Sequence, residues 1–168
     1  MTVDRDGLRA VQAPLKERYR AEARAALVTL HAQGVLGEQE VSCSVDTGRA
    51  LVNAGLHPAS GGDSLHACSG DMLLQALVAC AGVTLQSVAI NRGIEVSGRV
   101  LAEGDLDFRG TMGVDREVPV GFTAIRLTFD VQSDADSATL DAVLETTERY
   151  CVVLQTIRGA PPVTVQRV

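Results

Sequence analysis

Cysteine is the residue of this sequence best suited to covalent chemistry, and it occurs four times, at Cys43, Cys68, Cys80 and Cys151. A thiolate is a strong nucleophile, whereas a buried thiol usually behaves as a small hydrophobic side chain. Cys80 lies in the middle of an uncharged apolar stretch, so a reactive Cys80 requires a nearby cation to lower its pKa. Cys151 lies in a second apolar stretch. Two such thiols can face one another in a packed core and cycle between dithiol and disulfide.

Metal binding is the alternative use of these side chains. His66 and Cys68 form an H-x-C pair, and Cys80 is the nearest further ligand. At 1.5 Å per residue, however, Cys80 lies about 15 Å along its helix from the start. Because no set of four well-spaced ligands is visible, we expect no metal site, and no other cofactor is indicated.

Composition excludes several classes of partner. The chain has 168 residues, of which 46% are hydrophobic and 21% are charged, as in an ordinary globular protein. Its formal net charge is −6, and only 3% of its residues are aromatic. Nucleic-acid binding depends on basic surfaces and stacking side chains, so we expect no nucleic-acid partner.

The N-terminal residues contain no apolar segment followed by a small-residue cleavage site. We therefore expect a cytoplasmic protein with reduced cysteines. Residues 72–90 carry no charge over 19 positions, which is long enough to cross a bilayer. Polar side chains interrupt this segment, and it has no basic flank on the Asp71 side. We expect a core helix enclosed on all sides by protein and no membrane association.

The elements that must position the cysteines follow from periodicity. After an irregular arm over residues 1–13, helical spacing predicts an amphipathic helix over 14–33. Further helices are predicted at 72–90, at 138–150 and, after Cys151, in a short apolar run. Alternation predicts strands at 41–45, 49–52, 94–100, 106–108, 124–131 and 163–165. Glycine, serine and proline residues predict a loop over 53–70. This order indicates an α+β fold with antiparallel sheets instead of a βαβ repeat.

Four segments resemble a known family: Gly61-Gly62, the run SGDMLLQALVAC over 69–80, EGDLDFRG over 103–110 and ERYCVVLQT over 148–156. They are similar to the loop, the central helix, the following strand and the second cysteine motif of the OsmC/Ohr-like family of organic hydroperoxide reductases. Two cysteine motifs in this order are more specific than either helix alone. The resemblance covers about residues 40–168, so we divide the chain into an arm and amphipathic helix over 1–38 and an OsmC-like domain over 39–168.

The resemblance implies an OsmC-like fold, with antiparallel sheets around a long central apolar helix, in an intertwined homodimer. It implies that Cys80 attacks an organic hydroperoxide, releases an alcohol and becomes a sulfenic acid. Cys151 then resolves this acid as a disulfide, which a dithiol reductant, lipoyl or similar, reopens. Bridging requires the two Cα atoms to lie within about 7 Å.

Two features of the family are altered in this chain. The family's reductases use a glutamate near the start of the central helix, and the nearest carboxylate here is that of Asp71, our third catalytic candidate. They also use an arginine from an N-terminal strand, but residues 39–45 contain none, and Arg49 is the only cation in that hairpin. A divergent member is indicated. The alternative is a non-catalytic dimer that binds a hydrophobic ligand or responds to redox state through a slow disulfide.

Overall fold

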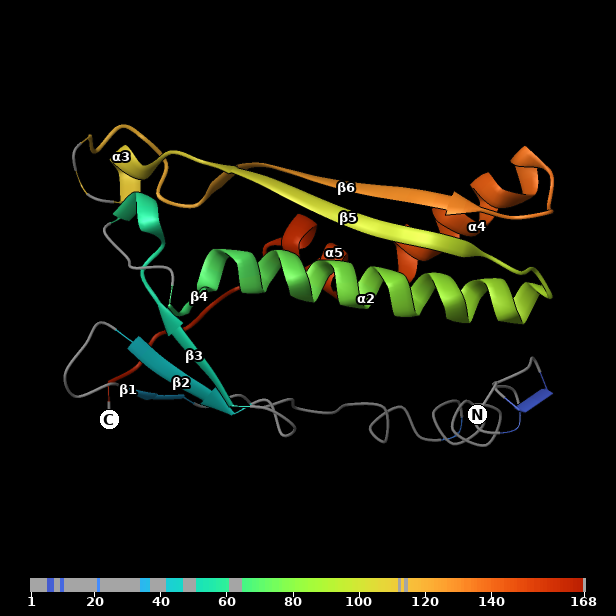
Figure 1. Ribbon diagram of the computed structural model, residues 1–168, viewed down its shortest axis with the longest axis horizontal. Coiled ribbons are helices and arrows are strands. Elements are labelled where there is room, and N and C mark those ends of the chain that lie inside the picture. The colour runs from blue at the N-terminus through green and yellow to red at the C-terminus, as the bar shows by residue number, and fades with distance from the viewer. Residues whose placement is uncertain are drawn as a thin grey trace. The chain divides into compact units, whose positions relative to one another are not determined.

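The computed structural model has an α+β fold, and it describes residues 6–7, 10, 21, 34–36, 42–46, 51–60, 65–111, 113 and 115–167. The chain divides into two compact units. Figure 1 labels the helices and strands of both. The first contains Met1–Leu15, Ala76–Leu101 and Leu127–Val168, and the second contains Lys16–Gln75 and Ala102–Arg126. The predicted helix over 14–33 lies outside the described residues, except for Ala21.

The second unit contains a sheet with the strand order β1-β2-β3-β4. Its strands are β1 (Gly34–Leu36), β2 (Ser42–Asp46), β3 (Leu51–Gly55) and β4 (Ala67–Cys68). Strands β2 and β3 form an antiparallel hairpin, as predicted. Strand β1, which the sequence analysis does not predict, pairs antiparallel with β2, and β4 pairs with β3 in parallel. The predicted loop over 53–70 is wrong at both ends, because β3 extends to Gly55 and β4 precedes the next helix. Between them lies the short 3-10 helix Pro58–Ser60.

Helix α2 (Ser69–Arg92) is the long apolar helix that the sequence predicts. Leucine and alanine dominate it, and both are strong helix formers. Asp71 in the first turn and Arg92 in the last turn each complement the helix dipole. Gly93 ends the helix in a left-handed conformation with φ 70°, which glycine adopts without steric cost, and its N–H donates to the Ile90 carbonyl.

Strands β5 (Ser97–Leu106) and β6 (Phe122–Gln132) form a two-stranded ribbon. Arg99 pairs with Asp130, and Arg126 pairs with Glu103. Because the later residue of β5 faces the earlier residue of β6, the two strands are antiparallel. Two predicted boundaries are wrong: residues 94–96 precede β5, and Phe108 begins the short helix α3 (Phe108–Thr111) instead of continuing a strand.

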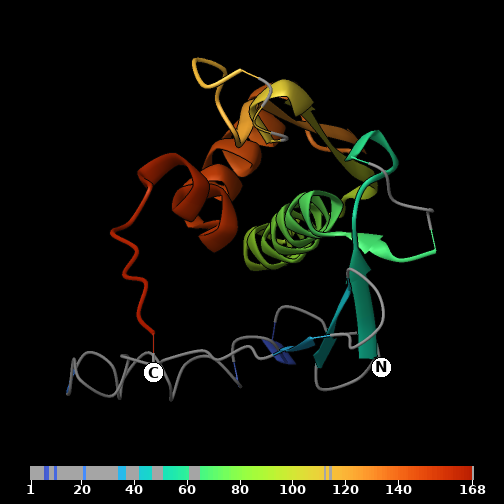
Figure 2. The same cartoon turned by 90° about the vertical axis from the view of Figure 1, so that its left-hand side faces the viewer.

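The core of the first unit lies between α2, the β5–β6 ribbon and helix α4 (Ser137–Tyr150). Leu85 and Ala89 of α2 are buried against Val143 of α4. The half-buried side chains packed around them are Val88, Ile94, Val96, Val100, Phe129, Val131 and Leu144. Figure 2 looks along α2 and shows α4 and the following helix on one side of it. Aliphatic side chains build this core, as the scarcity of aromatic residues predicts.

The junction after α4 positions the second cysteine. Cys151 leaves the helical conformation, with φ −70° and ψ 105°, while its N–H donates to the Thr147 carbonyl at 2.9 Å. Helix α5 (Val152–Gly159) begins at the next residue, and its Gln155 N–H donates to the Cys151 carbonyl at 2.9 Å. The short second helix is therefore confirmed.

The predicted strand over 163–165 is wrong, because this segment is not a strand and Val163 is 84% exposed.

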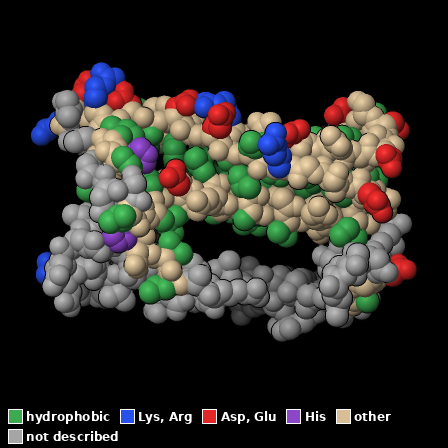
Figure 3. All heavy atoms as spheres, viewed as in Figure 1, with side chains coloured by type: hydrophobic (Ala, Val, Ile, Leu, Met, Phe, Trp, Pro, Cys, Tyr) green, Lys and Arg blue, Asp and Glu red, His purple; other side chains and the backbone are tan. Residues whose placement is uncertain are grey.

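One face of α2 is open in the single chain. Leu77, Ala81, Leu85 and Ala89 are buried, but Val83 is 72% exposed, and Leu73 is also exposed. Figure 3 shows apolar side chains on the surface along this helix. A single chain therefore does not enclose this helix on all sides, and the expectation that protein does so requires a second copy to cover the open face. Its length and composition suit a membrane span, but its packing in the core is equally typical of soluble proteins.

Candidate active site

The structure brings Cys80 and Cys151 together. Cys80 is half-buried near the middle of α2, and Cys151 is fully buried between α4 and α5. The two thiols are in hydrogen-bonding contact. The site is formed because α5 begins directly after Cys151 and directs its first turn at Cys80.

Cys80 has a lowered pKa. Its burial raises the pKa, but four hydrogen bonds to the sulfur outweigh this effect. The donors, in order of importance, are the Val153 N–H, the Cys151 thiol, the Val152 N–H and the Thr84 hydroxyl. Hydrogen bonds of this kind favour the charged form of the acceptor, so Cys80 ionises more readily than an ordinary cysteine.

The two amides are the first N–H groups of α5, which have no partner within their own helix. A helix N-terminus with free N–H groups carries partial positive charge and stabilises an anion. The side chain of Cys151, the residue that precedes the helix, makes no capping hydrogen bond. The sulfur of Cys80 on another helix therefore occupies the place of a capping anion.

Among the described residues, the groups that lower the pKa of Cys80 are neutral hydrogen-bond donors, and the expected cation beside Cys80 stays a prediction. No arginine of the described residues acts on the pKa of Cys80. Several are paired elsewhere on the surface, for example Arg99 with Asp130 and Arg158 with Glu148. Arg49, the predicted candidate, lies outside the described residues.

Cys151 behaves in the opposite way. Its burial raises its pKa, and the neighbouring Cys80 raises it further, both as a hydrogen-bond partner and as a negative charge. These effects outweigh the backbone N–H groups of Leu154 and Val153. The two shifts have opposite directions, so Cys80 is the first of the two residues to lose its proton as the pH rises, and the Cys151 thiol is the donor beside it.

Asp71 lies apart from this pair. Its carboxylate is exposed in the first turn of α2 and makes no hydrogen bond or ion pair with another described residue. Nine residues separate it from Cys80, which corresponds to about 13.5 Å along the helix axis.

Cys68 is a free thiol in β4. Within the part of the chain that the structure describes, no group of three or more His, Cys, Asp and Glu side chains can hold a metal ion.

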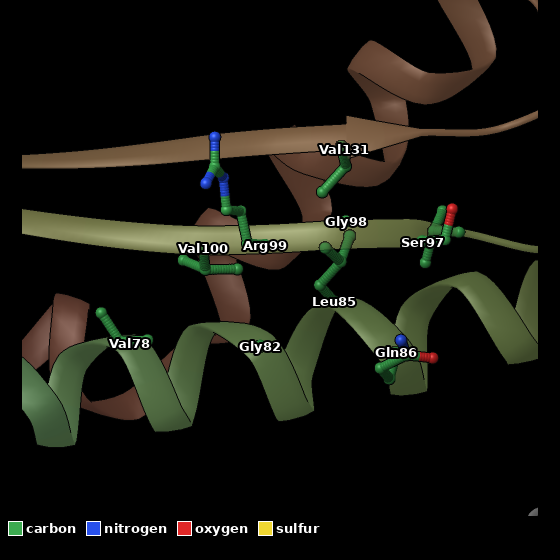
Figure 4. A pocket seen from close by; sticks show the side chains of 10 residues that line it. Val78, Gly82, Leu85, Gln86, Ser97, Gly98, Arg99, Val100 and Val131 are labelled. Carbon is green, nitrogen blue, oxygen red and sulfur yellow. The ribbon is translucent and has the colours of Figure 1, made fainter.

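An apolar pocket lies on the other side of α2. Its volume is about 250 Å³, and Figure 4 shows it between α2 and β5. The apolar lining comes from Val78, Gly82, Leu85, Val96, Val100 and Val131. Cys80 is two residues from both Val78 and Gly82, a rotation of about 200° around a helix. The sulfur therefore points away from this pocket.

The family model for OsmC-like proteins matches residues 61–166, which is more than half of the chain. The chain belongs to the OsmC-like protein family. Cys80, Cys151 and Asp71 all lie within the matched residues. No curated protein matches this OsmC-like sequence.

Solved structures agree with this OsmC-like assignment at the level of the fold. An OsmC-like protein from Mycoplasma pneumoniae has a TM-score of 0.65 and 17% identity, covering 79% of this chain and 89% of that chain. An organic hydroperoxide resistance protein OsmC from Legionella pneumophila has a TM-score of 0.59 and 17% identity, covering 80% and 92%. The organic hydroperoxide resistance protein OhrB of Bacillus subtilis has a TM-score of 0.51 and 18% identity, covering 77% and 92%.

Proposed function

We propose that this OsmC-like protein is a cysteine-based peroxidase that reduces organic hydroperoxides to alcohols. The asymmetric pair of thiols supports this proposal most strongly. Cys80 is half-buried with a lowered pKa, as a nucleophile requires, and Cys151 is buried with a raised pKa beside it. Membership of the OsmC-like family and fold relatives that are organic hydroperoxide resistance proteins also support it.

In the first step, the Cys80 thiolate attacks the terminal oxygen of the hydroperoxide. A sulfur–oxygen bond forms as the oxygen–oxygen bond breaks, and the leaving alkoxide takes a proton from water to become the alcohol. The sulfur is oxidised to a sulfenic acid, and the peroxide is reduced. The α5 amides and Thr84 favour the thiolate that starts this step.

In the second step, Cys151 attacks the Cys80 sulfenic acid. A sulfur–sulfur bond forms, the sulfur–oxygen bond breaks, and the hydroxyl group leaves as water with the proton of Cys151. A dithiol of the lipoyl class then reduces the disulfide and becomes a disulfide itself. Such a cycle requires a reducing compartment, which agrees with the cytoplasmic location that we propose.

A peroxide-consumption assay tests the proposed function directly. The purified protein is supplied with a dithiol, such as dihydrolipoamide, and with hydrogen peroxide, an alkyl hydroperoxide or a fatty-acid hydroperoxide. We expect catalytic consumption of the organic hydroperoxides, with one alcohol formed and one dithiol oxidised for each turnover. No consumption above the rate of the dithiol alone would contradict the proposal.

We predict that the protein is a homodimer in which the open face of α2 packs against a second copy. This face exposes Leu73 and Val83 on a helix that carries no charge over residues 72–90. Contiguous exposed apolar surface is typical of interfaces, and a helix presented to its own copy forms a symmetric contact. Light scattering at micromolar concentration should give twice the chain mass, and Val83→Glu should shift the mass toward the monomer. A wild-type monomer would contradict this prediction.

We propose that Asp71 contributes to catalysis from the second copy of the dimer, because it is too far along α2 to reach Cys80 of its own chain. It would act on the thiolate by orienting an arginine across the two-fold axis. Asp71→Asn should then lower hydroperoxide turnover clearly, with little change in melting temperature. The alternative role is complementing the helix N-terminus, which contributes about 0.3–1 kcal/mol. Unchanged turnover with a small loss of stability would leave only that role.

The pocket between α2 and β5 favours a second candidate function, namely binding of a hydrophobic ligand without catalysis. It is lined mainly by apolar side chains, and a Cβ atom at Gly82 would enter open space. Small-molecule sites are concave and mostly apolar. If the assay above finds no peroxide consumption while an apolar fluorescent probe binds with one site per chain, this second function is favoured.

A further inference from the structure

Cys151 is the single residue between α4 and α5, and its backbone sets the angle between these two helices. Its φ of −70° and ψ of 105° lie outside the helical region, whereas the residues on either side of it are helical. Its N–H donates to the Thr147 carbonyl of α4, and its carbonyl accepts from the Gln155 N–H of α5. Each of these bonds continues one helix, so rotation at Cys151 can still change the direction of α5 relative to α4.

Two side chains of α5 cross this junction and converge on Glu148 of α4. The Gln155 side-chain amide donates from Nε2 to the Glu148 carbonyl oxygen at 2.7 Å. The Arg158 guanidinium binds the Glu148 carboxylate, with 3.0 Å between Nη2 and Oε2. The carbonyl belongs to the last turn of α4, where carbonyl groups have no partner within the helix, so Gln155 satisfies an otherwise free acceptor. Both bonds depend on the angle that α5 makes with α4.

The Gln155 bond is the better suited of the two to fix this angle. The side chains of Arg158 and Glu148 are 56% and 44% exposed, and exposed ion pairs contribute little because water and salt screen them. The amide of Gln155 is uncharged, and its acceptor is the backbone of α4 instead of a mobile side chain. It therefore joins α5 directly to the end of α4, across Cys151.

This angle affects the redox chemistry of the pair, because a disulfide forms only in a narrow range of geometries. A Cys151 that is already held beside Cys80 in the dithiol form has lost the freedom that disulfide formation would otherwise remove. We propose that Gln155 is a positioning residue that fixes α5 to the end of α4, holds Cys151 beside Cys80 and thereby stabilises their disulfide relative to the dithiol. This inference rests on the proposed function, in which Cys151 resolves the Cys80 sulfenic acid.

The experiment measures the equilibrium between dithiol and disulfide without any peroxide, in a Cys43→Ser, Cys68→Ser background. The protein is equilibrated without oxygen in mixtures of dihydrolipoamide and lipoamide. Dihydrolipoamide gives two electrons and two protons to the protein disulfide, whose sulfur–sulfur bond breaks, and closes its own disulfide to become lipoamide. After an acid quench, N-ethylmaleimide labels each free thiol. Mass spectrometry then separates the dithiol, which carries two labels, from the disulfide, which carries none.

Gln155→Met keeps the length of the side chain and suits a helix, but it removes the donor. We expect half of this variant to be reduced at a ratio of dihydrolipoamide to lipoamide roughly threefold to tenfold lower than for the wild type, the range set by loss of one hydrogen bond. Gln155→Ala should shift the ratio in the same direction. Thr146→Val is the matched control, because it removes the 2.7 Å bond from the Arg92 guanidinium, which joins α2 to α4 without crossing Cys151. Its ratio should equal that of the wild type.

Equal ratios for both Gln155 variants and the wild type would overturn the proposal. The same shift in Thr146→Val would also overturn it, because that result indicates a general loosening of the helices. A shifted ratio in a protein that consumes no hydroperoxide would support the role of Gln155 and reject the proposed function. An unshifted ratio in an active peroxidase would reject the role of Gln155 alone.

Discussion

Replacing Cys80 with serine should lower hydroperoxide turnover by roughly 10⁴-fold or more, because removing the nucleophile of a catalytic unit removes the reaction path that the unit provides. Serine has nearly the same volume, but its hydroxyl is not ionised near neutral pH and does not take an oxygen atom from a peroxide. The hydrogen bonds from α5 and Thr84 remain available to it. If Cys80→Ser loses activity while its melting temperature is unchanged, the loss is due to the missing thiol and not to unfolding.

Replacing Cys151 with serine should give a different result. In the Cys151→Ser variant, Cys80 still reacts with the peroxide. One hydroperoxide is therefore consumed for each chain in a rapid first phase, and a sulfenic acid accumulates at Cys80. Multiple turnovers with the dithiol should slow strongly, since no disulfide forms for that reductant to open. Mass spectrometry after trapping the sulfenic acid with a cyclic diketone measures this intermediate.

Cys68→Ser is the matched control for both variants. Cys68 is also a free, half-buried thiol, but it lies in β4 and takes no part in the hydrogen bonds of Cys80. Its replacement should leave turnover unchanged. Steady turnover in Cys80→Ser, or undiminished dithiol-dependent turnover in Cys151→Ser, would contradict the roles proposed for these two residues.

The helices that position the pair could be predicted from the sequence because their signals are local. The uncharged run over 72–90 and the stop at Gly93 predict α2, which extends over Ser69–Arg92. The acidic and polar residues before 138 predict a helix start, and Asp136 accepts from the Thr139 N–H at 2.7 Å as the N-cap of α4. Each of these signals depends on residues within a few positions of one another.

The donors to Cys80 could not be predicted in the same way. Every helix has free N–H groups at its start, and which side chain they meet depends on how α5 packs against α2. The expectation of a nearby cation considers only side chains, whereas the described groups that lower the pKa of Cys80 include two backbone N–H groups. The predicted strand over 163–165 failed for a related reason, because alternating residues form a strand only where another strand is available to pair with them.

The α5 amides can be tested by removing a single N–H group. Val152 is the first residue of α5, and its N–H donates to the Cys80 sulfur. Proline lacks this N–H but is well tolerated at the first position of a helix. The preceding Cys151 is already extended, with φ −70° and ψ 105°, the region that a following proline favours. Val152→Pro should therefore remove one donor while preserving the helix.

Hydrogen bonds to the sulfur favour its charged form, so loss of the Val152 N–H should raise the pKa of Cys80 in Val152→Pro. The thiolate fraction increases as pH rises through the pKa, so the wild type should react faster at every pH between the two midpoints. Above both midpoints the variant should react as fast or slightly faster, because a more basic thiolate is a better nucleophile. Thiolate absorbance and peroxide consumption as a function of pH measure the shift.

Ser137→Pro makes the same change at the first residue of α4, after the extended Asp136, and should leave the profile unchanged. Coincident profiles for Val152→Pro and the wild type would show that the α5 amides do not stabilise the thiolate.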